Sequence, residues 1–132
     1  MQTALLELHK ALYAGLTSHT PLMDVVSDVL DDVDEGQPYP YVTIGDPVAN
    51  PWDTKTSIGE NITFVLHTWS DYDGKAESYR VMNLIHEALS QPLSIEGGFY
   101  VFKFERESQN VFTDIDGITR HGVMNFRAYV NQ

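Results

Sequence analysis

The chain contains no cysteine, which excludes disulfide bonds, thiolate nucleophiles and zinc sites built from cysteine. Basic residues are also few, because eight Lys and Arg stand against 19 Asp and Glu, giving a net charge of −11. A protein that binds nucleic acid through its phosphates needs a basic face, and this composition argues against one. An acidic surface that keeps the protein soluble is the simpler interpretation, and an acidic inhibitor that imitates DNA is an alternative.

Long hydrophobic runs are missing as well, since no apolar stretch approaches the ~20 residues that a membrane helix needs. The first ten residues have no basic leader and are interrupted by Glu7, His9 and Lys10, so a signal peptide is not expected. The chain has 132 residues, of which 42% are hydrophobic. These values favour one globular domain over residues 1–132, without a membrane partner.

Recognised catalytic and metal-binding motifs are absent too. The five histidines form no zinc pattern, and neither a nucleophile elbow nor a phosphate loop is present, so no cofactor is expected. His67 and His121 lie on strands that could be neighbours, and a metal-dependent enzyme that uses them with nearby acids is therefore an alternative. The acidic run Asp31–Glu35 could hold a divalent ion, but it lacks the spacing and glycine of a calcium loop. A solvated acidic turn is favoured.

Hydrophobic periodicity and turn residues predict the secondary structure. We expect helices over 3–17 and from Asp73 to just before Pro92, a short helix from Pro21 to about Val29, and strands over 39–45, 61–69, 93–96, 99–113 and 118–130. Residues 46–60 are predicted to be a long polar connection. Strands grouped around two helices indicate an α+β fold. It consists of an antiparallel sheet of about five strands, with a mixed sheet as the alternative, packed by two main helices and one short helix.

Three features of this pattern indicate contacts with a partner. The first helix carries a second apolar stripe with Leu6 and Tyr13, which fits either a partner or a helix buried on two sides. The strand 61–69 is apolar on both faces, so one face could be covered by a neighbouring subunit. Trp52, in the long connection, either anchors a partner or folds back onto its own domain.

A fourth feature is the stretch Thr119-Arg-His-Gly, which places two potential cations, Arg120 and His121, at the start of a strand. Gly122 leaves room there for a bulge or a close approach of the backbone. The preceding Asp116-Gly117 is typical of a hairpin turn rather than a calcium loop. The Arg-His pair is interpreted as a contact site, with pairing of Arg120 to local acids as the alternative.

Four stretches together resemble the tail-completion family of long-tailed bacteriophages and prophages. They are Tyr39–Asp46, Trp52–Glu60, Thr63–Ser70 followed by Gly74–Glu77, and Asp116–Arg127. The resemblance implies an α+β subunit of a hexameric ring that caps the finished tail tube, docks to the head connector or stopper, and lets DNA pass without specific binding. It implies a virion protein, present in the bacterial cytoplasm during assembly, and no catalytic residues. Another connector or head-completion protein is the alternative.

The residues that match the family's motifs become interface candidates through this resemblance. They are Trp52, Lys55, His67, Trp69, Arg120, His121, Gly122 and Arg127. Leu6 and Tyr13, from the second stripe on the first helix, join them as interface candidates.

Overall fold

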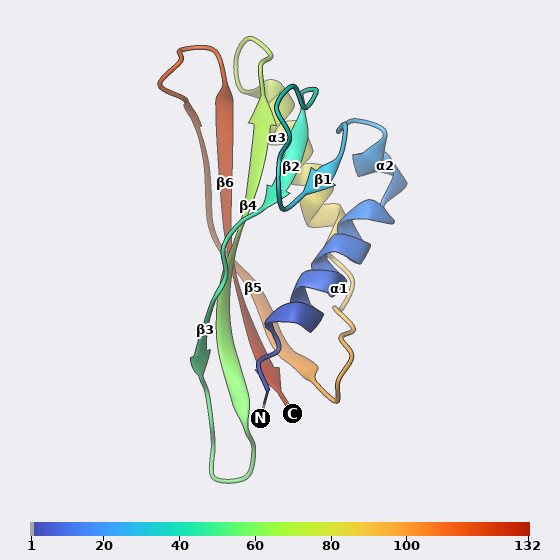
Figure 1. Cartoon of the computed structure of the whole chain (residues 1–132), viewed down its shortest axis with the longest axis vertical. Helices are drawn as coiled ribbons and strands as arrows, with labels where there is room; N and C mark the ends of the chain where they lie inside the picture. The colour runs from blue at the N-terminus through green and yellow to red at the C-terminus, as the bar shows by residue number, and fades with distance from the viewer. Residues whose placement is uncertain (1) are drawn as a thin grey trace.

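The computed structural model describes residues 2–132 as one long sheet with two helices packed on one of its faces (Figure 1). The elements are α1 (Leu5–Thr17), α2 (Thr20–Met23), β1 (Val29–Leu30), β2 (Tyr41–Ile44), β3 (Val48–Pro51), β4 (Gly59–Ser70), α3 (Ala76–Ala88), β5 (Tyr100–Thr113) and β6 (Arg120–Asn131). None of the helices in this part of the chain is long and apolar enough to cross a membrane.

The sheet has six strands and is mixed, which confirms the predicted α+β class. Its main path runs β1-β2-β4-β6-β5, and β3 pairs with the part of β4 that β2 leaves free. Among the strand pairs within residues 2–132, only β1–β2 is parallel. The central strand β4 pairs with β6 along its whole length, from Gly59–Asn131 to Ser70–Arg120. This long pairing makes the molecule elongated.

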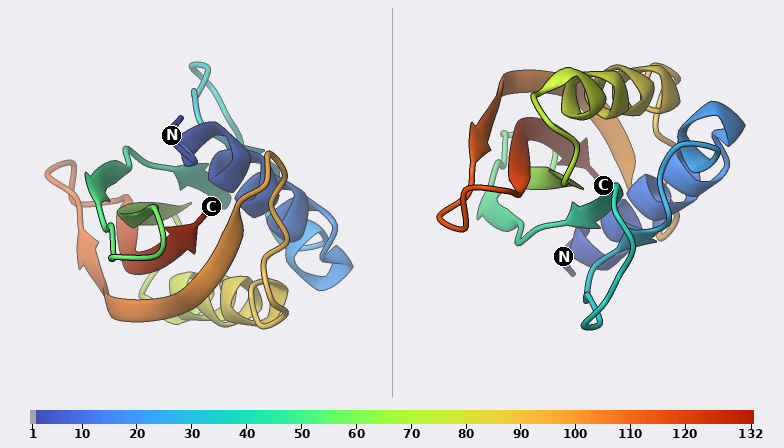
Figure 2. Two further views of the ribbon diagram at one scale, coloured as in Figure 1. Left: turned by 90° about the horizontal axis from the view of Figure 1, so that it is seen from below. Right: turned by 90° about the horizontal axis from the view of Figure 1, so that it is seen from above.

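The hydrophobic core lies between the sheet and the helices α1 and α3, as the end-on views show (Figure 2). The predicted stripe of α1 is buried at Leu8, Leu12 and Leu16. Alternate residues of β4 and β6 meet it from the sheet, and Phe64 stacks on Phe126 with ring centroids 5.3 Å apart. Burial of these side chains supplies the main driving force for folding.

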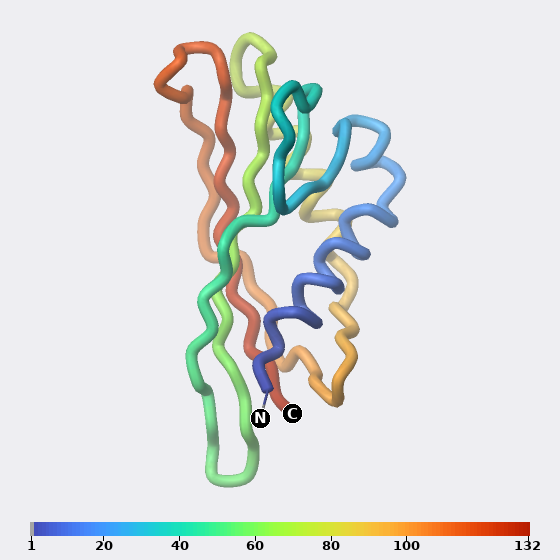
Figure 3. The backbone as a smooth tube through the Cα atoms, in the orientation of Figure 1, coloured from blue at the N-terminus to red at the C-terminus, as the bar shows by residue number. Residues whose placement is uncertain are grey.

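Two hairpins extend beyond the helices at opposite ends of the molecule (Figure 3). One is the β3–β4 hairpin, so the predicted connection 46–60 contains a strand that periodicity did not reveal. The other is the β5–β6 hairpin, whose turn at Asp116-Gly117 is confirmed, with Gly117 at φ +74°. Its register shifts between Val101 and Lys103 and again between Arg106 and Ser108.

The predicted helix 21–29 is wrong beyond Met23. The chain instead turns at Ser27, whose amide donates to Pro40 O at 2.8 Å, and Val29 and Leu30 pair with β2 as strand β1. Pairing with β2 thus overrides the local helical signal.

The predicted strand 93–96 is also wrong, because these residues form a loop. Leu93 and Ile95 pack against the core. The alternation of apolar and polar residues over 93–96 therefore reflects which side chains are buried and not pairing with another strand. Gly97 and Gly98 both have a φ of +78°, and they connect this loop to β5 instead of joining two paired strands. The second main helix begins at Ala76, slightly later than its predicted start at Asp73.

Candidate functional site

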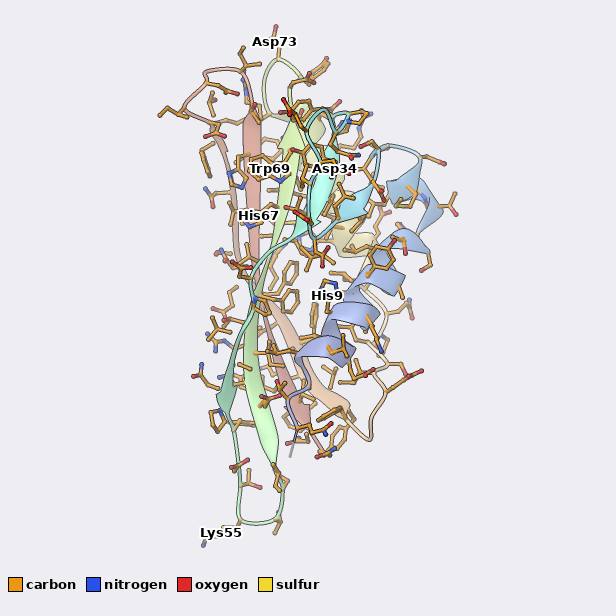
Figure 4. All side chains as sticks on the ribbon, viewed as in Figure 1. His9, Asp34, Lys55, His67, Trp69 and Asp73 are labelled. Atoms are coloured by element: carbon orange, nitrogen blue, oxygen red, sulfur yellow. The ribbon has the colours of Figure 1, made fainter. Side chains whose placement is uncertain are left out.

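The face of the sheet opposite the helices carries most of the interface candidates. Outward residues of β4 and β6 are only half-buried, whereas their inward neighbours are fully buried. Val65, His67 and Trp69 point outward from β4, and His67 and Trp69 are labelled on its upper half in Figure 4. This helix-free face therefore carries large side chains without a second layer of the same chain over them.

Four strands contribute to one row of aromatic side chains on this face. The register places Tyr41 beside Trp69, Trp69 beside His121, and His121 beside Phe112. Trp69 stacks on His121 with ring centroids 3.8 Å apart. The ring centroid of Tyr41 lies 6.2 Å from that of Trp69, and the ring centroid of Phe112 lies 4.8 Å from that of His121. We call these four residues the aromatic row.

The two histidines that the sequence placed on neighbouring strands do meet. His67 Nδ1 lies 2.7 Å from His121 Nε2, so one imidazole donates a hydrogen bond to the other. Desolvation lowers the pKa of His67 against an opposing effect of Asp46. Desolvation and the nearby His67 lower the pKa of His121, and Asp114 opposes them. We call His67 and His121 the histidine pair.

The metal-enzyme alternative requires further ligands beside the histidine pair. Across residues 2–132, no group of three or more His, Cys, Asp or Glu side chains is placed to hold a metal ion. The acidic run Asp31–Glu35 does not form such a group either. Partial burial and the hydrogen bond between them are sufficient to explain how both histidines pack.

The Thr119-Arg-His-Gly stretch is held by the turn before it. Asp116 accepts hydrogen bonds from the amides of Ile118 and Thr119 and from the Thr119 hydroxyl, and these bonds lower its pKa. Arg120 donates to the carbonyl of Ile118, and its charge helps to lower the pKa of Asp116. Gly122 provides the predicted close approach, because a Cβ there would lie 2.1 Å from Thr68 Oγ1.

Trp52 folds back onto its own domain. Its ring centroid lies 4.9 Å from that of Tyr129 and 5.7 Å from that of Phe102, which is 63% exposed. Arg127 bonds to Glu107 and donates to Asn61 Oδ1 at 2.7 Å. Lys55 lies apart from both, at the tip of the β3–β4 hairpin (Figure 4).

Leu6 and Tyr13 lie on α1, on the other side of the molecule from the helix-free face. Their side chains are 61% and 47% exposed, so the second stripe of α1 is not covered by this chain. The candidates therefore fall into three places: the helix-free face, the outer side of α1, and the hairpin tip.

Sequence reasoning missed Tyr41, Phe112 and Phe102 as members of these surfaces. Tyr41 and Phe112 alternate outward on predicted strands, and the Asp116-Gly117 turn fixes which residues of β5 and β6 face each other. That register signal would have identified Phe112 as the neighbour of His121.

Comparison with known proteins identifies the family. The family model described as "Tail completion protein gp17" matches residues 10–131, which is nearly the whole chain. The chain belongs to the tail completion protein gp17 family. Members are structural components of phage virions and not enzymes, in agreement with the predicted class and location.

A curated relative and one solved structure agree with this assignment, and a second solved structure shares the fold. The tail completion protein gp17 of Bacillus phage SPP1 is 41% identical over 125 residues, covering 94% of this chain and 92% of the relative. The structure of SPP1 gp17 aligns with a TM-score of 0.67 at 38% identity, over 96% of this chain and 91% of that one. A chain in the virion of a native gene transfer agent particle aligns over 100% of both chains with a TM-score of 0.85. At 21% identity, that likeness supports the fold alone.

Proposed function

We propose that this member of the tail completion family assembles as a hexameric ring that caps the finished tail tube and joins it to the head connector. The observation that carries the proposal is the 41% identity to a tail completion protein over 94% of the chain. The ring is a structural part of the virion, and phage DNA passes through it without specific binding.

The distribution of exposed apolar residues supports a ring. One set lies on the helix-free face, with the aromatic row and with Trp52, Phe102 and Tyr129, and another lies on α1 with Leu6 and Tyr13. Two different surfaces on opposite sides of a subunit suit head-to-tail contacts, which close into a ring when the rotation allows it. In this arrangement the helix-free face of one copy meets α1 of the next.

The hairpin tip and the overall charge have separate roles in the proposal. Lys55 lies at the far end of the β3–β4 hairpin, which extends beyond the body of the subunit as an arm toward the tail tube or the next copy. With a net charge of −11 per copy, the wall of the ring is acidic. An acidic wall keeps DNA phosphates from binding to it during passage.

A phage from which this gene is deleted tests the role in tail completion. We expect it to produce tails of abnormal length that do not join heads, scored by electron microscopy of lysates. Tails of normal length joined to heads in the deletion strain would refute the proposal. Full-length unattached tails beside heads that lose DNA would indicate the alternative, a connector on the head side.

Complementation of that strain tests the contact on α1. Tyr13→Glu places a charge in the proposed contact and should reduce joined particles by roughly tenfold or more, as expected when a charge is desolvated without a partner. Tyr79→Glu is the matched control, because Tyr79 is 52% exposed on α3 and lies outside both surfaces. Equal complementation by the two variants would exclude α1 as a contact.

A further inference from the structure

Three connections meet at one end of the sheet, in the upper part of Figure 1. They are residues 31–40 between β1 and β2, residues 71–75 between β4 and α3, and residues 114–119 between β5 and β6. The strand register brings them together. Tyr41, after the first connection, pairs with Trp69 of β4. Ser70, before the second connection, pairs with Arg120, which follows the third. We call these three connections the loop end.

The loop end exposes large apolar side chains that the core does not use. Ile115 in the β5–β6 turn is 101% exposed, Ile118 in the same turn is 63% exposed, and Tyr72 in the neighbouring connection is 56% exposed. Asp114 accepts a hydrogen bond from the amide of Ile115, and Asp116 accepts one from the amide of Ile118. The turn that presents both isoleucines to water is therefore well defined. Apolar side chains gathered on one surface are typical of a site that a partner covers.

The loop end also carries most of the net charge. Its three connections contain eight Asp and Glu and one Lys, a net charge of −7, and the rest of the chain has a net charge of −4. Within residues 2–132, no ion pair joins any of these eight acids to Lys or Arg, whereas Glu7, Glu105 and Glu107 are paired in this way. The exposed isoleucines are thus surrounded by carboxylates that this chain leaves without a basic partner.

The opposite end of the molecule differs in charge. Figure 4 labels Asp73 at the loop end and Lys55 at the far tip of the β3–β4 hairpin. Residues 53–58, which form that tip, contain one acid and one base and are neutral in sum. The two ends of the elongated subunit therefore suit different partners.

We propose that the loop end docks to a basic surface of the head connector, which covers Ile115 and Ile118 and binds the carboxylates around them. The inference rests on the proposed function and names the end of the subunit that meets the head. Charge complementarity identifies the partner, because a charge of −7 repels both DNA and a second copy of this chain and attracts Lys and Arg of another protein. With the β3–β4 hairpin directed to the tail tube, the loop end is directed to the head.

The apolar and the charged residues contribute to docking in different ways. The carboxylates attract a basic surface before contact and orient it, which raises the rate of association and excludes acidic partners. Ile115 and Ile118 lose their contact with water only when the surfaces meet, so they stabilise the bound state. An apolar centre with a polar rim is the usual organisation of a protein interface. Replacing each kind of residue should therefore give a different result.

The first experiment tests the apolar centre. The probe is the DNA-filled head isolated from the deletion strain, and cosedimentation at several protein concentrations measures binding. We expect Ile115→Ser to weaken binding by roughly tenfold, as when one large apolar side chain is no longer buried. The fold should be unaffected, because Ile115 is fully exposed. Ile58→Ser is the matched control, since Ile58 is 50% exposed in the β3–β4 hairpin, and it should bind heads like the wild type.

The second experiment tests the charges with the same probe. Asp71 and Asp73 are exposed, so the double change Asp71→Asn and Asp73→Asn removes two charges and disturbs no buried group. We expect wild-type binding to weaken between about 0.1 M and 1 M salt, as the Debye length falls from about 10 Å to about 3 Å. The double variant should bind more weakly at low salt and respond less to salt. Glu96→Gln with Glu105→Gln removes two charges elsewhere and should match the wild type.

Isolated tail tubes are the second probe and separate the two ends. Ile115→Ser and the Asp71, Asp73 double variant should bind tubes as the wild type does. Self-association should also persist in both variants, measured by light scattering after size exclusion.

The outcomes distinguish this inference from the proposed function. Unchanged binding of both loop-end variants to heads would overturn docking at this end and leave the ring standing. Weaker binding to tubes, with heads unaffected, would overturn the assignment to the head. Wild-type binding to lysozyme, an unrelated basic protein, as strong as binding to heads would reduce docking to unspecific attraction and overturn it too. A wild-type protein that binds neither heads nor tubes would refute the proposed function itself.

Discussion

Gly122 lies directly opposite Thr68 in the β4–β6 pairing, at a point where the sheet has no space for a side chain. A Cβ at position 122 would lie 2.1 Å from Thr68 Oγ1 and 2.7 Å from Met82 Cε. We expect Gly122→Ala to lower the free energy of unfolding by about 1–3 kcal/mol, the usual cost of overpacking a core. Urea denaturation followed by circular dichroism measures this change.

Two further variants make this prediction specific. Gly15→Ala adds the same methyl group in α1, where its nearest neighbour would be Leu89 Cδ2 at 3.6 Å, and it should stabilise the helix by about 0.5–1 kcal/mol. Thr68 Oγ1 is buried without a hydrogen-bond partner in the described chain. Adding Thr68→Ala to the Gly122→Ala variant should therefore restore part of the lost free energy of unfolding. Without such recovery, the contact with Thr68 would not be the cause.

The two stripes of α1 should respond differently to the same substitution. Leu12 is 2% exposed and lies in the core, so Leu12→Ala should lower the free energy of unfolding by about 2–5 kcal/mol. Leu6 is 61% exposed, so Leu6→Ala should change it by less than about 0.5 kcal/mol. Thermal or urea unfolding of the separate variants measures both values.

Leu6→Ala should nevertheless reduce self-association, because Leu6 lies on the proposed contact. Light scattering at matched protein concentration measures this reduction. A variant that unfolds like the wild type and also assembles like it would remove Leu6 from the contact, whereas a large loss of stability would place Leu6 in the core of the subunit.

Elements with strong hydrophobic periodicity were predictable from the sequence. The stripes of α1 and α3 and the alternation of β4 and β6 predict which side chains are buried, and the structure confirms this at Leu12, Ile85, Phe64 and Met124. The short strands β1 and β3 were not predictable. Each contributes only a few residues, and its identity as a strand depends on pairing with β2 or β4, which local sequence does not encode.

The candidate site was predictable only in part, for the same reason. His67 and His121 could be placed on neighbouring strands, but their direct contact depends on the register of β4 with β6. Phe112 was missed although the Asp116-Gly117 turn sets its pairing with His121, because the register shifts of β5 lie farther from the turn. The sequence could not decide whether Trp52 anchors a partner or folds back onto its own domain. Its packing on Tyr129 follows from the β3–β4 pairing, which the sequence did not reveal.

At the scale of the whole molecule, shape and charge act on assembly in opposite directions. The elongated sheet places the helix-free face and α1 on opposite sides, which suits head-to-tail contacts. The net charge of −11 on each copy opposes every such contact. Local contacts across uncharged surfaces must therefore outweigh a repulsion that extends over the whole subunit.

This balance predicts that added salt strengthens assembly. Salt shortens the range of electrostatic repulsion from about 30 Å at 0.01 M to about 8 Å at 0.15 M, while apolar contacts persist. We expect the apparent dissociation constant of the assembly to fall by roughly an order of magnitude over this range at pH 8. Sedimentation velocity at several protein concentrations measures it. If salt weakened the assembly instead, ion pairs rather than apolar surfaces would hold the copies together, and Arg127 and Lys55 would be the first residues to replace.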